Sequence, residues 1–225
     1  MLEFIQPISK REQVVQAIKD AILSGTIEPG ASIVESKVAQ QLGAGVPLIR
    51  EALIELEHQG FVQRTPYKGT TVTKLSPADI KRIFRLRVEL EALAIEWAKE
   101  NIKAADLEDL RRRIQRMEEA ARVVDLAQFY ENDLAFHRAI WVLSDNPYLV
   151  DALERVVSPL FAFFLMKTNR QRESYVESAA MHMAIVEAIP TKSATELREM
   201  MRQSLADWKD DMMDLLFPPE PQSQD

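Results

Sequence analysis

The sequence predicts a mainly α-helical protein of two domains, an N-terminal winged helix-turn-helix followed by an all-α helical bundle. The chain has 225 residues, which is enough for two small domains or one large one. Only 6 residues are glycine, which disfavours a fold built from many tight β-turns. Apolar residues recur at helical spacing along most of the chain, and strand-like alternation is confined to one stretch in the N-terminal third.

The N-terminal domain, residues 1–75, has the pattern of three helices and a hairpin. An amphipathic segment before Gly25 predicts the first helix, and TIEPGASI after it predicts a turn. VESKVAQQLG predicts a short helix that ends at Gly43, and PLIREALIELEHQG predicts one that ends at Gly60. Two β-branched stretches around Lys68 predict a hairpin. Two short helices and a hairpin in this order are typical of a winged helix-turn-helix.

The second domain is predicted over 76–217 and is helical throughout. Ser76 suits a helix cap and Pro77 suits the first helical position, so the boundary falls there. We expect Pro159 to kink the helix that contains it. The polar, proline-rich tail, residues 218–225, is expected to be disordered. The predicted helices cover 77–100, 105–122, 126–144, 147–167, 171–189 and 194–216.

Composition excludes several classes of protein. Cysteine is absent, which excludes a disulfide framework, a thiolate metal site and a cysteine nucleophile. No apolar stretch approaches the roughly 18 residues that a membrane span needs, and we expect a cytoplasmic protein. The net charge is −7, but residues 1–75 hold 8 basic and 8 acidic side chains, so the excess negative charge lies in the remainder. The N-terminal domain is therefore the part that a polyanion repels least.

The candidate DNA contacts lie on the second helix of the helix-turn-helix and on the hairpin. The second helix enters the major groove with its N-terminal residues. Arg50 near that end can pair with guanine or clamp a phosphate, and Lys68 can reach the DNA backbone or minor groove. Alternatively, Arg50 pairs with Glu51 or Glu55 and Lys68 is a solvated turn residue. The predicted DNA-binding set is Ser36, Lys37, Val46, Pro47, Leu48, Arg50, Tyr67, Lys68 and Gly69.

Residues 29–75 resemble the DNA-binding domain of GntR-family bacterial transcription regulators. The motifs PG, ES..A..LG, REAL..LE..GFV and P.KGT.V stand at the family's spacing. LSPADIKRIFRLRVELEALAIEWA, DLAQFYENDLAFHRAIWVLSDNPYL and HMAIVEAI resemble the C-terminal domain of its FadR-like (FCD) subgroup. The resemblance implies a homodimeric regulator, such as a repressor, that binds an inverted-repeat DNA operator. It also implies a C-terminal domain that binds a small-molecule effector, and no enzymatic activity.

The start of the recognition helix departs from the family pattern. Family members usually have Ser-Arg-Thr-Pro there, whereas this chain has Gly45, Val46, Pro47 and Leu48. The missing hydroxyls and arginine predict fewer phosphate contacts and a lower affinity for DNA. We expect Val46 and Leu48 to contact thymine methyl groups instead.

Asp133, His137 and His182 are the candidate metal ligands. Asp133 and His137 lie four residues apart on one helical face, and His182 lies on another predicted helix. Two imidazoles and a carboxylate suit Zn²⁺, Ni²⁺ or Mn²⁺, although the spacing alone favours an ion pair on a helix surface and a core histidine. The resemblance makes a divalent metal one of two alternatives, because FCD domains commonly bind one with one Asp and three His, whereas some FadR-like proteins bind their effector without a metal. Ser204 stands where the third histidine is expected, which predicts a weaker site.

The resemblance also implies that an organic acid is the effector. The guanidinium of Arg87 can donate two parallel hydrogen bonds to a carboxylate. Other polar residues on the helices expected to surround the cavity complete the candidate set. The predicted effector-binding residues are Arg87, Tyr130, Asn132, Asn169, Arg172 and Ser204.

Two other classes of function stay open. Two histidines and an aspartate in a helical bundle can activate water on a metal, as in a metal-dependent hydrolase. No separate general base or nucleophile motif accompanies them, and a hydrolase leaves the winged helix unexplained. The second alternative is a dimer that binds other proteins and has lost sequence-specific DNA binding. The altered recognition helix and the neutral charge of the N-terminal domain are compatible with it.

Overall fold

The chain divides into two compact units, Met1–Lys74 and Leu75–Asp225. A computed structural model describes residues 9–168 and 175–217. The predicted disordered tail and the first residues of the helix predicted over 171–189 lie outside this described part. Within it, none of the helices combines the length and the apolar character that crossing a bilayer requires.

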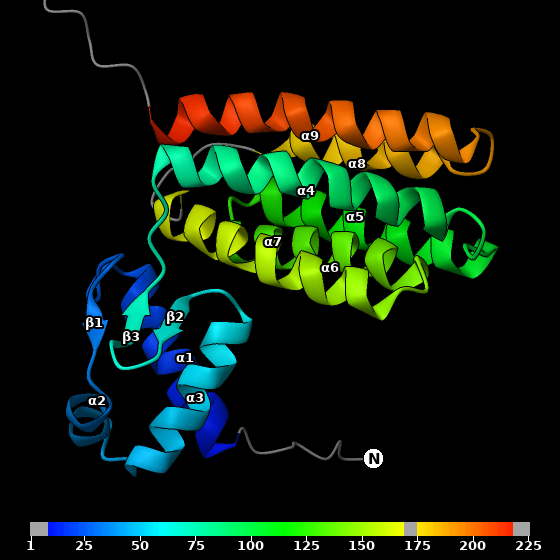
Figure 1. Ribbon diagram of the computed structural model, residues 1–225. Coiled ribbons are helices and arrows are strands. Elements are labelled where there is room, and N and C mark those ends of the chain that lie inside the picture. The colour runs from blue at the N-terminus through cyan, green and yellow to red at the C-terminus, as the bar shows by residue number, and fades with distance from the viewer. Residues whose placement is uncertain (1–8, 169–174, 218–225) are drawn as a thin grey trace, which may run out of the picture. The chain divides into compact units, whose positions relative to one another are not determined.

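The first unit is a winged helix with a small antiparallel sheet (Figure 1). The predicted hairpin is β2–β3, and a third strand, β1, pairs with the other side of β3. The sequence does not predict β1, because two residues are too few for an alternating pattern and they fall within the expected turn. The elements are α1 (Lys10–Leu23), β1 (Ser32–Ile33), α2 (Glu35–Leu42), α3 (Val46–His58), β2 (Val62–Thr65) and β3 (Gly69–Val72).

Two glycines and one buried side determine where α3 begins and ends and which of its sides faces solvent. α2 ends at Gly43, which has φ +60°, and α3 is followed by Gly60 at φ +81°. Both conformations are left-handed and suit glycine. α3 packs against α1 through side chains that are almost completely buried, so the opposite side of α3 is left to solvent. The apolar core includes Ile18, Ile22, Ile49, Leu53 and Leu56.

The second unit is helical throughout its described residues. α4 starts with a capping box, in which Ser76 Oγ accepts from the Asp79 amide at 3.2 Å and Asp79 Oδ2 accepts from the Ser76 amide at 3.1 Å. This matches the predicted helix start. α7 continues through Pro159 as one helix. The helices are α4 (Pro77–Ala98), α5 (Ala104–Arg122), α6 (Leu126–Leu143), α7 (Pro147–Thr168), α8 (Val176–Ala188) and α9 (Ala194–Leu216).

α4 is the central helix of the second unit. It packs against α9, α7 and α6, while α5 packs against α6 and α8 (Figure 1). The rings of Phe84, Phe164 and Trp208 join α4, α7 and α9, with centroids 5.2 to 6.3 Å apart. The same inner side of α4 carries two buried charged residues, Arg87 and Glu91. This arrangement places charged groups in the middle of an apolar core.

Candidate metal centre and nucleic-acid interface

The carboxylate of Glu91 is the centre of a buried polar network. Glu91 and Arg87 are each 1% exposed, and Arg87 Nε donates to Glu91 Oε1 at 2.7 Å. Glu91 Oε2 accepts from His137 Nδ1 at 2.5 Å and from Trp141 Nε1 at 3.1 Å. The network therefore connects α4 to α6, and both carboxylate oxygens are satisfied.

The charges of this network are coupled. Burial opposes ionisation of Glu91, but the charges and hydrogen bonds of His137 and Arg87 outweigh it and lower the pKa to about 2. Burial likewise disfavours a proton on His137, yet the charge of Glu91 and the hydrogen bonds with Asp133 and Glu91 raise its pKa. Glu91 is therefore ionised at neutral pH, and it increases the basicity of His137.

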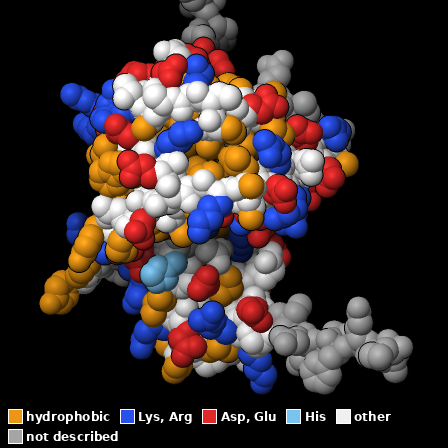
Figure 2. Space-filling view, turned by 90° about the vertical axis from the view of Figure 1, so that its right-hand side faces the viewer, with side chains coloured by type: hydrophobic (Ala, Val, Ile, Leu, Met, Phe, Trp, Pro, Cys, Tyr) orange, Lys and Arg blue, Asp and Glu red, His pale blue; other side chains and the backbone are white. Residues whose placement is uncertain are grey.

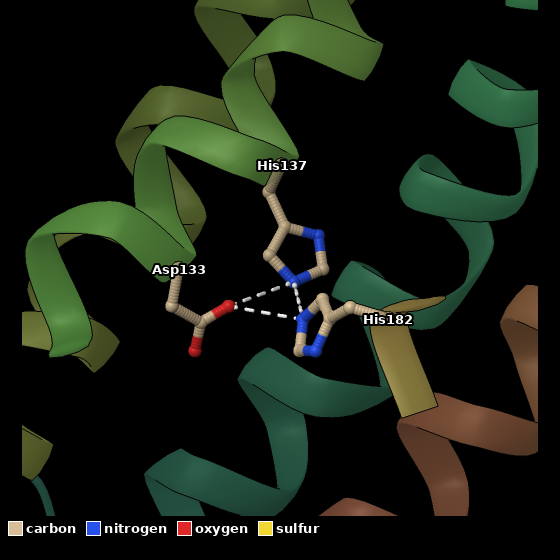
Figure 3. A group of neighbouring side chains, drawn as sticks. All are labelled: Asp133, His137 and His182. Carbon is tan, nitrogen blue, oxygen red and sulfur yellow. Dashed lines mark hydrogen bonds and ion pairs between the residues drawn. The ribbon is translucent and has the colours of Figure 1, made fainter. Parts of the chain in front are cut away.

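Asp133, His137 and His182 meet inside the second unit, Asp133 and His137 from α6 and His182 from α8 (Figure 3). All three are buried, so the surface ion pair favoured by spacing alone is wrong. Asp133 Oδ1 lies 3.4 Å from His137 Nε2 and 3.1 Å from His182 Nε2. The two Nε2 atoms are 3.4 Å apart.

The hydrogen bonds of the rings determine which nitrogens face the cluster. His137 Nδ1 donates to Glu91, and His182 Nδ1 donates to the carbonyl of Ser178 at 2.7 Å. In the neutral rings, both Nε2 atoms therefore carry lone pairs, and Asp133 Oδ1 lies within 3.4 Å of each. Three electron-rich atoms this close repel one another unless a proton or a metal ion lies among them. While both rings are neutral, no described residue donates a hydrogen bond to Asp133 Oδ1, and these three atoms fit a divalent cation.

A small cavity of about 20 Å³ adjoins the cluster. This volume accommodates one water or one ion. Ser204 of α9 is on the cavity wall, at the position where the sequence analysis expects a third histidine. The lining residues are Arg87, Asp133, His137, Met181, His182, Ile185, Met201, Ser204, Leu205 and Trp208.

The predicted effector residues are only partly brought together. Arg87 and Ser204 line the cavity, whereas Tyr130 and Asn132 do not. The Tyr130 hydroxyl accepts from Thr168 at 3.3 Å, and Asn132 Nδ2 donates to the Gln128 carbonyl at 2.7 Å. Asn169 and Arg172 lie outside the described residues.

Arg87 is already engaged by protein groups. Besides its ion pair with Glu91, its Nη2 lies 3.2 Å from His137 Nε2, a contact that is a hydrogen bond only when the ring is neutral. Its Nη1 is buried and has no hydrogen-bond partner in the described part of the chain. Arg87 therefore has one free donor atom rather than the parallel pair that the sequence analysis expects.

The predicted DNA contacts lie on exposed parts of the first unit. Ser36 and Lys37 are exposed in the first turn of α2, and Pro47 is exposed at the start of α3 between the half-buried Val46 and Leu48. At the tip of the hairpin, Tyr67, Lys68 and Gly69 are exposed, with left-handed backbone at Tyr67 and Gly69.

Arg50 has a partner that the sequence analysis does not identify. Its guanidinium pairs with Glu35 of α2, with Nη2 2.8 Å from Oε2, rather than with Glu51 or Glu55. Helical spacing reveals pairs within one helix, whereas this pair joins two helices.

On the face of the molecule in Figure 2, basic and acidic side chains are intermixed rather than separated by sign.

A winged helix followed by a helical domain with a small buried polar site is the architecture of a bacterial DNA-binding transcription regulator. The family model "Bacterial regulatory proteins, gntR family" matches residues 10–72, and the model "FCD domain" matches residues 82–207. The chain therefore belongs to the GntR family and carries an FCD domain, which confirms the resemblance found in the sequence.

Known proteins of similar sequence are also transcription regulators. The HTH-type transcriptional regulator McbR of Escherichia coli (strain K12) is 26% identical over 204 residues, 88% of this chain and 92% of McbR. The gluconate operon transcriptional repressor of Bacillus subtilis (strain 168) is 24% identical over 222 residues, 95% of this chain and 89% of the repressor. The solved structure of E. coli McbR/YncC has a TM-score of 0.70 at 24% identity, covering 94% of this chain and 98% of that one, and this likeness supports the fold.

Replacing Glu91 by Gln should reduce the free energy of unfolding by about 3–5 kcal/mol, because it leaves the buried Arg87 cation without its counter-charge. Glu89→Gln on the same helix is the matched control. Glu89 is 53% exposed and pairs with Arg202 at the surface, so its loss should cost about 0–1 kcal/mol. Urea denaturation followed by far-ultraviolet circular dichroism measures both. Equal, small losses would show that the network does not stabilise the domain.

Proposed function

We propose that the chain is a sequence-specific DNA-binding regulator whose helical domain holds a divalent cation, of the Zn²⁺, Ni²⁺ or Mn²⁺ type, at Asp133, His137 and His182. The observation that carries the proposal is the convergence of three lone-pair atoms beside a cavity of one-ion size. Because the chain belongs to the GntR family, we expect this site to control DNA binding. We propose further that the protein acts as a cytoplasmic homodimer on an inverted-repeat operator, because a two-fold protein matches two half-sites.

The chain's own groups prepare this site. Glu91 accepts a hydrogen bond from His137 Nδ1–H, so that Nε2 points into the cluster, and the Ser178 carbonyl does the same for His182. A bound cation would supply positive charge that relieves the repulsion among the three atoms. Because His137 and His182 come from α6 and α8, occupancy would hold these helices together.

An organic acid is a second candidate ligand, favoured by one observation. Arg87 Nη1 is a buried donor without a partner, and Arg87 lines the cavity. A carboxylate oxygen satisfies such a donor. A cavity of about 20 Å³ is too small for an organic acid, so its binding requires the lining to move. The flexible side chains of Met181 and Met201 suit such a movement.

Control of DNA binding would follow from linkage between the two units. Only residues 73–76 separate β3 from α4. A ligand of the helical domain that favours one arrangement of the DNA-binding units changes operator affinity, and the operator changes ligand affinity by the same factor, typically worth about 1–3 kcal/mol. We infer a regulator rather than an enzyme. Each polar group of the cluster is either a proposed ligand or hydrogen-bonded to one, which leaves no separate general base among the described cavity residues.

The metal proposal predicts that His137→Ala and Asp133→Asn abolish stoichiometric Zn²⁺ binding, measured by isothermal titration and by metal content after purification without chelator. His58→Ala is the control, because His58 is exposed on α3. Ser204→His should tighten binding by about tenfold or more by adding a fourth ligand. Wild-type protein that binds no Zn²⁺, or a His137→Ala variant that binds as well as wild type, would contradict the proposal.

Metal affinity should increase with pH. The pKa of His137 is raised above its ordinary value of 6.5, so a proton competes with the cation for this ring until the pH exceeds the raised pKa. Displacing one proton strengthens binding by up to about tenfold per pH unit below that pKa, and the gain fades above it. Titrations between about pH 6 and pH 8.5, in buffers of different ionisation enthalpy, measure affinity and proton release. Constant affinity without proton release would contradict this role of His137.

The DNA proposal predicts that Lys68→Ala weakens binding to all duplexes by a similar factor. Lys68 at the hairpin tip would neutralise one phosphate, so its loss should reduce the slope of log affinity against log salt by about 0.9. Fluorescence anisotropy with labelled duplexes at several salt concentrations measures this slope. Lys192→Ala removes the same charge from the second unit and serves as the control. A slope for Lys68→Ala equal to that of the control would exclude the phosphate contact.

A further inference from the structure

Two nitrogens of the Arg50 guanidinium, Nε and Nη2, contact the carboxylate of Glu35. Glu35 is the first residue of α2, and Arg50 lies on the first turns of α3. Arg50 Nε lies 3.4 and 3.2 Å from the two carboxylate oxygens of Glu35, and Nη2 lies 2.8 Å from Oε2. The side chains are 53% and 25% exposed. The guanidinium is thus fixed at the surface with one edge occupied, and Nη1 has no hydrogen-bond partner among the described residues.

This pairing changes which DNA group Arg50 prefers. A phosphate that approached the guanidinium would also approach the Glu35 carboxylate about 3 Å away, and the repulsion offsets the attraction. The edge of a base carries no net charge, so it experiences little of this repulsion. A guanidinium donates hydrogen bonds to guanine O6 and N7 whether or not its charge is compensated.

The surroundings of the pair agree with this preference. Arg50 is the only lysine or arginine on α3, and its neighbours at the start of the helix are the apolar Val46 and Leu48. Residues 1–75 have equal numbers of acidic and basic side chains. This domain therefore carries little of the excess positive charge that strong, sequence-independent binding needs.

Resting on the proposed contact of α3 with DNA, we propose that Glu35 is a selectivity residue: it orients Arg50 toward a guanine in the major groove and suppresses its use as a phosphate clamp. Glu35 thereby weakens binding to unrelated DNA and sharpens the choice of one G·C base pair. Of the two DNA groups that the sequence leaves open for Arg50, a guanine or a phosphate, this proposal selects the guanine.

The test compares full-length variants on one probe, a pool of random-sequence duplexes, before and after selection by the wild-type protein. Glu35→Gln removes the charge but keeps the size of the side chain. Glu51→Gln is the matched control, because it removes the same charge from an exposed position next to Arg50 on α3. Affinities at several salt concentrations and the sequences enriched by each variant are the two readouts.

Glu35→Gln should bind the unselected pool more tightly, with a salt slope steeper by about 0.9, because Arg50 becomes available to a phosphate. Its discrimination at one G·C pair should fall about tenfold or more. Glu51→Gln should show neither change. Arg50→Lys, which keeps the charge but not the planar fork, should lose the same discrimination with an unchanged salt slope.

Two results would overturn the inference while leaving DNA binding through α3 intact. One is that Glu35→Gln behaves like Glu51→Gln. The other is that Arg50→Ala weakens all sequences equally and reduces the salt slope by about 0.9, which is the signature of a phosphate clamp. If Arg50→Ala instead leaves both affinity and enriched sequences unchanged, the proposed contact of α3 with DNA fails, and the inference fails with it.

Discussion

The helical domain depends on one buried carboxylate, that of Glu91. It compensates the charge of Arg87 and accepts hydrogen bonds from His137 Nδ1 and Trp141 Nε1. A buried carboxylate is costly unless its oxygens are paired and hydrogen-bonded, and here both oxygens of Glu91 are engaged. The direction of His137 Nε2, on which the metal cluster depends, is therefore set by a residue of α4 that is not itself a candidate ligand.

Two of the molecule's Arg–Glu ion pairs illustrate how the surroundings change the role of the same two side chains. Arg87 and Glu91 are one helical turn apart and shielded from water, so each is required to keep the other in the core. Arg50 and Glu35 face solvent from separate helices, and water screens their attraction. The buried pair Arg87–Glu91 positions His137 in the proposed metal site. The exposed pair Arg50–Glu35 affects which DNA groups the proposed DNA-binding surface attracts.

Much of the fold follows from local signals in the sequence. The start of α4 is predictable because Ser76 and Asp79 cap it, and the end of α2 because Gly43 adopts left-handed backbone. Such signals act within a few residues and need no tertiary information. The strand β1 is not predictable in this way, because Ser32 pairs with Thr71 through contacts distant in sequence.

The site is only partly predictable. Four-residue spacing places Asp133 and His137 on one face, but their burial depends on the packing of α6, and the family resemblance was needed to add His182. Tyr130 shares the face of His137 but lies two turns away, about 10 Å along the helix, and Asn132 is rotated off that face. The Glu35 partner of Arg50 and the compensation of Arg87 depend on how side chains meet, which spacing along the chain does not define.

The contact between Trp141 and Glu91 has a practical consequence for solution work. The chain has 3 tryptophans, Trp97, Trp141 and Trp208, and all belong to the second unit. Tryptophan fluorescence therefore reports on the second unit alone and contains no signal from the winged helix. Trp208 lines the cavity and Trp141 donates to the carboxylate that orients His137. Two of the three tryptophans thus lie in or one residue away from the proposed metal site, so their fluorescence would report its occupancy without an added label.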